Sequence, residues 1–111
     1  MKLKEIFLVE SSNTTDKYTV AIDMDGVLAD FSAGSKEMLG MDKDTADKRN
    51  FWSTLSRYDK HEQKFFLNLP VMSDAFDLMK FVHQNFKNYF ILTASGYTPK
   101  DAPEQKKEWI A

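Results

Sequence analysis

The sequence has no cysteine, only four glycines and three prolines, and no long apolar run. Without cysteine, disulfides, thiolate metal sites and thiol nucleophiles are excluded, which fits a reducing cytoplasm. The apolar run Ile6–Val9 is too short for a signal peptide, and no segment approaches the ~20 apolar residues of a membrane span. We therefore expect a cytoplasmic protein with no membrane partner.

Neither sign of charge dominates either, since 15 basic and 17 acidic residues give a net charge of −2. Binding of duplex nucleic acid needs a clustered basic surface, so it is not expected, although a single nucleotide stays open as a ligand. The chain has 111 residues, of which 42% are hydrophobic and 14% aromatic. This is enough for one domain, residues 1–111, with its own core.

Two short segments, Tyr18–Ile22 and Tyr89–Leu92, have the apolar and β-branched character of strands that are covered on both faces of a parallel sheet. Leu3–Val9 predicts one more strand. Helices are expected from Ser32 or Ser35 to Leu39 (ended by Gly40), from Asp44 or Thr45, over Tyr58–Leu67, over Ser73–Phe86, and from Asp101. This alternation predicts an α/β fold, with residues 1–31 and 88–111 as the core and a helical insert over about 32–72.

Polar residues follow both of the better strands. Asp23 and Asp25 come after the first strand, and Thr93 and Ser95 after the second. Carboxyl ends of parallel strands meet at one sheet edge, where ligands bind. Strand alternation places the two aspartates on one side, and Gly26 lets the chain turn there. Two adjacent carboxylates are tolerated when a cation such as Mg²⁺ lies between them or when one holds a proton.

Simpler interpretations of these residues stay open. An acidic pair after a strand is often a helix cap or a solvated turn, and Asp30 can either contact the site or cap the next helix. A helix-loop-helix calcium site is excluded, because Leu28 and Gly34 occupy the positions that need glycine and glutamate. His61 and His83 each stand alone, which favours surface or helix positions over metal binding.

The stretch Val20–Phe31 resembles the first motif of the haloacid-dehalogenase superfamily, an apolar strand followed by Asp-x-Asp-x-Thr/Val and a helix. Ile91–Ala94 resembles its second motif, an apolar strand that ends in Thr or Ser. Phe65–Pro70 and Lys107–Ile110 are similar to the 5'(3')-deoxyribonucleotidase branch of phage and bacterial type. The similarity covers about residues 18–111 and implies a three-layer, Rossmann-like core with a partial parallel sheet and a small helical cap.

The resemblance implies a Mg²⁺-dependent phosphomonoester hydrolase that acts on a small phosphate ester, in particular a deoxynucleoside monophosphate. Asp23 would be the nucleophile, and Asp25 would act as acid and then as base. Both would hold the metal, Asp23 through its carboxylate and Asp25 through its backbone carbonyl. The phosphate-binding residues would be Thr93, Ala94 and Gly26. The substrate-binding candidates are Phe31, Phe51 and Ser95, with Trp52 and Phe66 as further rings for a base, although for each of these rings a place in the core is favoured over contact with a base.

The pattern departs from the family in its last part. The family also uses a lysine beside the phosphoryl group and an acidic pair after another strand, and this chain ends within the helix that starts at Asp101. Lys100, Lys106 and Lys107 do not follow the right strand and are expected to be solvent-exposed. The chain is therefore a fragment of a nucleotidase, a degenerate protein with a binding or regulatory role, or a protein completed by a partner. Leu3–Val9 is expected to cover the open sheet edge as a hairpin; without it, the edge favours a homodimer.

Overall fold

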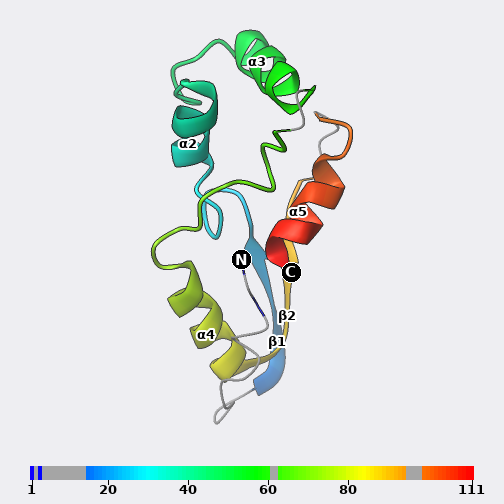
Figure 1. The fold of residues 1–111 in the computed structure, drawn as a ribbon. Coiled ribbons are helices and arrows are strands. Elements are labelled where there is room, and N and C mark those ends of the chain that lie inside the picture. Colours follow the sequence, from blue (N-terminus) through cyan, green and yellow to red (C-terminus); the bar gives the residue numbers. More distant parts are fainter. Residues whose placement is uncertain (2, 4–14, 61–62, 95–98) are drawn as a thin grey trace.

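The computed structural model describes Met1, Leu3 and residues 15–60, 63–94 and 99–111. In this part of the chain two strands form a parallel sheet, and the fold is mixed α/β. The elements in chain order are β1 (Thr15–Asp23), α2 (Phe31–Gly34), the π-helix η1 (Ser35–Leu39), α3 (Lys48–Lys60), α4 (Ala75–Asn85), β2 (Phe86–Leu92) and α5 (Ala102–Ile110). Figure 1 shows α2 and α3 beyond the carboxyl ends of the strands, α4 near their other end, and α5 alongside β2.

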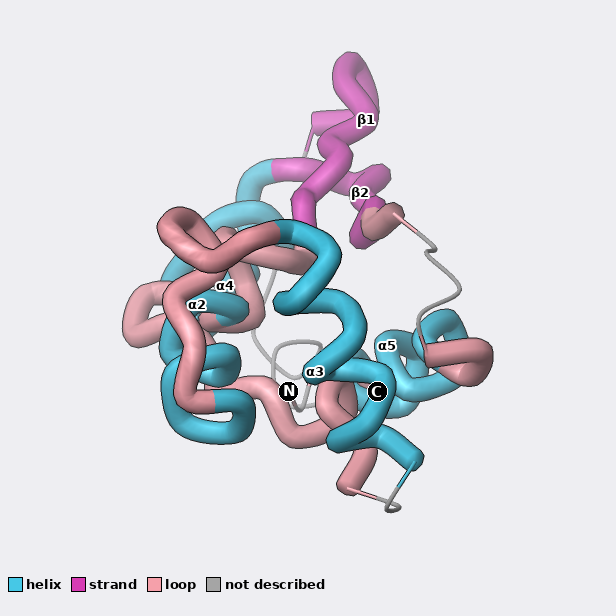
Figure 2. The backbone as a smooth tube through the Cα atoms, turned by 90° about the horizontal axis from the view of Figure 1, so that it is seen from above, coloured by secondary structure: helices cyan, strands magenta, loops and turns pink. Residues whose placement is uncertain are grey.

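The sheet has one covered and one open face. The register pairs Ile22 with Ile91 and Ala21 with Phe90. Ile22 is buried and Ile91 half-buried, whereas Phe90 and Leu92 are 48% and 58% exposed. Figure 2 shows the strands at the rim of the molecule with the helices on one side. The expectation of strands covered on both faces is therefore wrong for the described residues.

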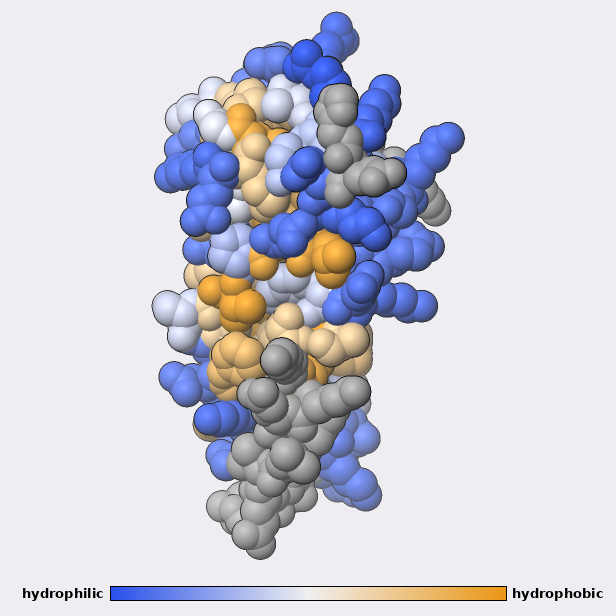
Figure 3. Space-filling view, viewed as in Figure 1, coloured by the Kyte–Doolittle hydropathy of each residue, from blue (hydrophilic) through white to orange (hydrophobic). Residues whose placement is uncertain are grey.

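The core is formed by buried apolar side chains of α3, α4 and α5, of the end of β1, and of the loops after β1 and α3. Its fully buried apolar side chains include Met24, Leu28, Leu55, Phe65 and Met79. Removal of such side chains from water is the main favourable term in folding. Figure 3 shows further apolar patches at the surface in the middle of the molecule, with hydrophilic residues around them.

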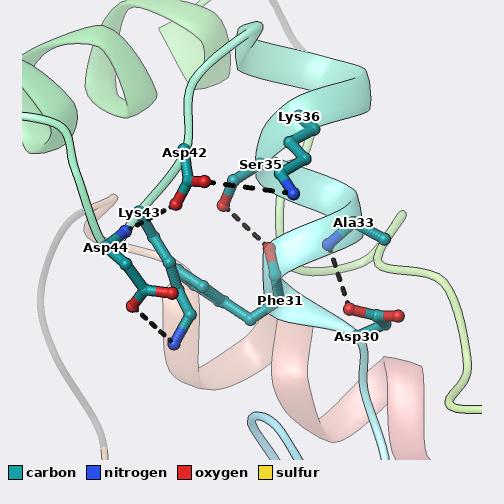
Figure 4. Close-up of polar contacts among 8 residues, drawn as sticks. All are labelled: Asp30, Phe31, Ala33, Ser35, Lys36, Asp42, Lys43 and Asp44. Atoms are coloured by element: carbon teal, nitrogen blue, oxygen red, sulfur yellow. Dashed lines mark hydrogen bonds and ion pairs between the residues drawn. The ribbon is translucent and has the colours of Figure 1, made fainter.

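The predicted helix that Gly40 ends is confirmed, since α2 and η1 run together to this left-handed glycine with φ 66°. Its first turn is capped by Asp30, whose Oδ1 accepts a hydrogen bond from the Ala33 N–H at 3.0 Å (Figure 4). The cap is thus neither Ser32 nor Ser35. Of the two roles left open for Asp30, the structure shows the helix cap.

The next helix, α3, starts later than the sequence suggested. It begins at Lys48 instead of Asp44 or Thr45. Asp47 explains the shift, because its Oδ2 accepts from the Asn50 N–H at 3.2 Å and so satisfies a donor in the first turn.

The helix expected over Tyr58–Leu67 is wrong. The helix α3 ends at Lys60, and Lys64 has a φ of 51°, which a right-handed helix cannot contain. The N–H of Phe65 donates to Asp59 Oδ1 at 2.7 Å, so a side chain takes the place of a helical carbonyl. The chain therefore turns back toward the sheet after α3.

The second strand and the helix before it are confirmed with shifted ends. α4 begins at Ala75, two residues after the expected cap Ser73, and β2 follows it directly at Phe86. His83 lies on α4, as expected of a helix residue, and its Nδ1 is 3.0 Å from the Tyr89 hydroxyl oxygen.

The ends of the chain meet at α5, where the Met1 amino group donates to the Trp109 carbonyl oxygen. Apart from Leu3, the strand expected over Leu3–Val9 lies outside the described residues, as does His61. Within the described ranges, no helix has the length and apolar character needed to cross a membrane.

Candidate active site

The first part of the site is the turn that follows β1. The strand ends at the exposed Asp23, and the Met24 carbonyl then accepts from the N–H groups of Leu28 and Ala29, both at 2.9 Å. Gly26 has a φ of 83°, which favours glycine. Its N–H donates to the Ala29 carbonyl at 2.8 Å. The expected phosphate-binding role of Gly26 would therefore require this hydrogen bond to open.

The second part is a buried lysine that joins the ends of both strands. Lys106 is 4% exposed. Its Nζ lies 3.1 Å from Asp25 Oδ2, 3.2 Å from Thr93 Oγ1 and 2.7 Å from the Ala94 carbonyl oxygen. The structure thus brings together three predicted site residues, Asp25, Thr93 and Ala94. They surround Lys106, which the sequence analysis did not place in the site. Ser95 lies outside the described residues.

The expectation that Lys106 is solvent-exposed is wrong, whereas Lys100 and Lys107 are exposed as predicted. The helical spacing of the sequence could have identified Lys106 as a buried residue. Ala102, Lys106 and Trp109 stand at positions i, i+4 and i+7, which share one helix face, and all three are buried. A lysine on the same helix face as a buried alanine and a buried tryptophan is expected to be buried as well. A buried ammonium group needs hydrogen-bond acceptors.

Aromatic rings cover the lysine on the side of the insert. The Phe66 ring centroid is 4.6 Å from Lys106 Nζ, within the range of a cation–π interaction. Phe66 packs against Phe31 at 6.2 Å between centroids, and Phe31 against Phe51 at 5.8 Å. Phe51 and Phe66 are buried and Phe31 is half-buried, while Trp52 is 42% exposed. Stacking of a base on Phe51 would therefore require this cluster to open.

The carboxylates can be tested against the implied Mg²⁺. Asp25 Oδ1 is buried and has no hydrogen-bond partner within the described ranges, and Asp23 lies at the same sheet edge. The described residues contain no group of three or more candidate metal ligands. Mg²⁺ often uses only one or two carboxylates together with waters and substrate phosphate. A site of that kind would use the Asp23 carboxylate and the Asp25 backbone carbonyl, as the resemblance implies.

Comparison of the chain with protein-family models, with curated proteins and with solved structures found no match. The resemblance to haloacid-dehalogenase proteins therefore rests on the sequence motifs alone. The structure adds that Asp25 and Thr93, one from each motif, share the ammonium group of Lys106.

Proposed function

We propose that this protein is a phosphomonoester hydrolase of the haloacid-dehalogenase type, acting through an aspartyl-phosphate at the carboxyl ends of the two strands. The observation that carries the proposal is the convergence of Asp25, Thr93 and Lys106 at the carboxyl ends of two parallel strands. Opposite charges and a hydroxyl donor meet there, as transfer of a phosphoryl group requires.

In the first step a carboxylate oxygen of Asp23 attacks phosphorus, and the bond from phosphorus to the ester oxygen breaks. Asp25 protonates the departing oxygen. In the second step a water attacks the phosphorus of the aspartyl-phosphate, and Asp25 takes its proton, so that phosphate leaves and Asp23 is restored. Since Lys106 holds Asp25 Oδ2, the unpaired Oδ1 is the atom we assign to the proton transfers.

Thr93 and Lys106 would stabilise the phosphoryl oxygens, because a hydroxyl and an ammonium group can both donate to them. Mg²⁺, when bound by the Asp23 carboxylate and the Asp25 backbone carbonyl, would offset the negative charge on those oxygens. We propose deoxynucleoside monophosphates as the substrate class, with the base on the rings that keep an accessible side, Phe31 and Trp52.

The test is hydrolysis of p-nitrophenyl phosphate and of deoxynucleoside monophosphates, with Mg²⁺ and with EDTA. Asp23→Asn should lower kcat at least about 10³-fold, since it removes the attacking charge but keeps the shape. Asp16→Asn is the matched control, because Asp16 is also an exposed aspartate of β1. Equal activity in wild type and Asp23→Asn would refute the mechanism.

One observation favours a second function, a phosphate-binding protein without turnover. The donors expected to face the phosphoryl group are engaged within the chain: Lys106 by Asp25, Thr93 and Ala94, and the Gly26 N–H by Ala29. Calorimetric binding of a deoxynucleoside monophosphate, undiminished in Asp23→Asn and with no phosphate release in either protein, would support this second function.

A further inference from the structure

Gln105 on α5 is buried, at 2% exposed, and uses its whole amide group. Its Oε1 accepts from the backbone N–H groups of Phe66 at 3.0 Å and Leu67 at 3.2 Å. Its Nε2 donates to the carboxylates of Asp59 at 2.9 Å and Asp101 at 3.0 Å. A side-chain amide offers two donors and a carbonyl acceptor, so both of its ends are fully engaged here.

These contacts connect the insert to the lysine of the site. Consecutive helix residues point about 100° apart. Gln105 therefore faces the chain that returns from the insert, while Lys106 faces the strand ends. The backbone that Gln105 holds belongs to Phe66, and the ring of Phe66 covers Lys106 Nζ at 4.6 Å. The low exposure of Lys106 thus depends on a loop whose position Gln105 sets.

We propose that Gln105 is a positioning residue that fixes Phe66 over Lys106 and so couples the placement of the helical insert to the phosphoryl-transfer site. When its bonds to the loop break, Phe66 moves away, water reaches Lys106, and the ammonium group is no longer confined to Asp25 and Thr93. The catalytic consequence rests on the proposed function, whereas the coupling itself does not.

Two variants test this coupling: Gln105→Glu, which adds a negative charge, and the double variant Gln105→Glu/Asp59→Asn, which also removes one. In Gln105→Glu the carboxylate can still accept from the loop, but an oxygen now faces Asp59 Oδ2 in place of the donating Nε2. The new carboxylate then meets the like charges of Asp59 and Asp101, and the loop is pushed away from α5. Adding Asp59→Asn places an amide N–H group opposite the new carboxylate of residue 105. The amide oxygen of the same asparagine can still accept from the Phe65 N–H, as Asp59 Oδ1 does in the wild type. Asp101 Oδ1 still faces residue 105 in the double variant, so this variant should restore most of the contact.

A matched control separates coupling from general loosening. Trp109 lies one turn after Gln105, is buried, and donates from Nε1 to the Leu69 carbonyl at 2.8 Å. It anchors α5 to the same returning chain, three residues beyond Phe66. Trp109→Phe should lower the melting temperature without uncovering Lys106.

The primary readout is the acetylation rate of Lys106 under native conditions, measured by peptide mass spectrometry relative to the exposed Lys107. We expect Gln105→Glu to raise the rate about tenfold, which corresponds to loss of a hydrogen bond of ordinary net strength. The double variant and Trp109→Phe should stay close to wild type. The kcat for p-nitrophenyl phosphate should fall by a similar factor in Gln105→Glu and recover in the double variant.

Protection of Lys106 that is unchanged in Gln105→Glu would overturn the coupling, and so would equal deprotection by Trp109→Phe. If Gln105→Glu does not fold, Asp59→Asn alone supplies a milder perturbation. It should raise the acetylation rate of Lys106 by a smaller factor, and an unchanged rate would contradict the coupling. The expected acetylation pattern in a protein without phosphatase activity would support the coupling and refute the proposed function.

Discussion

Replacement of Lys106 by methionine removes the ammonium group that joins the two strand ends but keeps most of the buried aliphatic stem. Three acceptors lose their donor: Asp25 Oδ2, Thr93 Oγ1 and the Ala94 carbonyl. Breaking a fully buried ion pair on one side costs about 3–5 kcal/mol. The Asp25 side chain is 30% exposed, so water can replace part of the lost contact. We therefore expect the free energy of unfolding to fall by about 1–3 kcal/mol.

Differential scanning calorimetry converts this estimate into a temperature. An unfolding entropy of about 2.1 cal/mol/K per residue makes 1 kcal/mol worth about 4 °C for 111 residues. Lys106→Met should therefore lower the melting temperature by about 4–12 °C. Lys107→Met is the matched control, because Lys107 is the exposed next residue of the same helix, and it should shift the temperature little.

A double-mutant cycle with Asp25→Asn isolates the pair. Because each single variant already breaks the ion pair, Lys106→Met should cost about 1 kcal/mol less in the Asp25→Asn background than in wild type. Equal melting temperatures of Lys106→Met and Lys107→Met, or strict additivity in the cycle, would refute the buried contact on which the site is built.

Substitutions at three further positions test the surrounding structure through the stability of the fold. Gly34→Ala should cost about 1–3 kcal/mol, because an added Cβ would lie 2.5 Å from Cδ2 of the buried Leu69, and an unchanged or raised melting temperature would contradict that packing. Asp30→Ala should cost about 1 kcal/mol through loss of the α2 cap, whereas Asp30→Asn should retain most of it. Burial raises the pKa of Tyr89 above its ordinary value, so stability should fall as the pH rises from about 10 through the folded-state pKa. Tyr89→Phe should make this alkaline decline shallower.

Much of the fold could be predicted because its signals are local. The strand before Asp23, the strand that ends at Leu92 and the helix that starts after Asp101 all have compositions that decide their structure. Gly40 likewise ended a helix as a left-handed glycine does. These predictions needed no knowledge of what each element packs against.

The failures depend on contacts far apart in the sequence. Apolar residues such as Phe90 predicted a strand covered on both faces, but composition cannot tell how many helices reach each side of a sheet. The helix predicted after Tyr58 gives way to a turn at which Asp59 binds the backbone of Phe65 and Gln105 binds that of Phe66. The role of Lys106 became visible only when α5 was placed beside the strand ends.

Trapping the aspartyl-phosphate tests the central claim most directly. Asp25→Asn should be incubated with Mg²⁺ and acetyl phosphate, whose acetate leaving group needs no proton from Asp25. Without this residue as base, hydrolysis of the intermediate slows. Intact-mass and peptide mass spectrometry should then show one phosphoryl group on Asp23 and none in Asp23→Asn/Asp25→Asn. A protein that stays unmodified, or that is modified equally when Asp23 is replaced, would contradict the account.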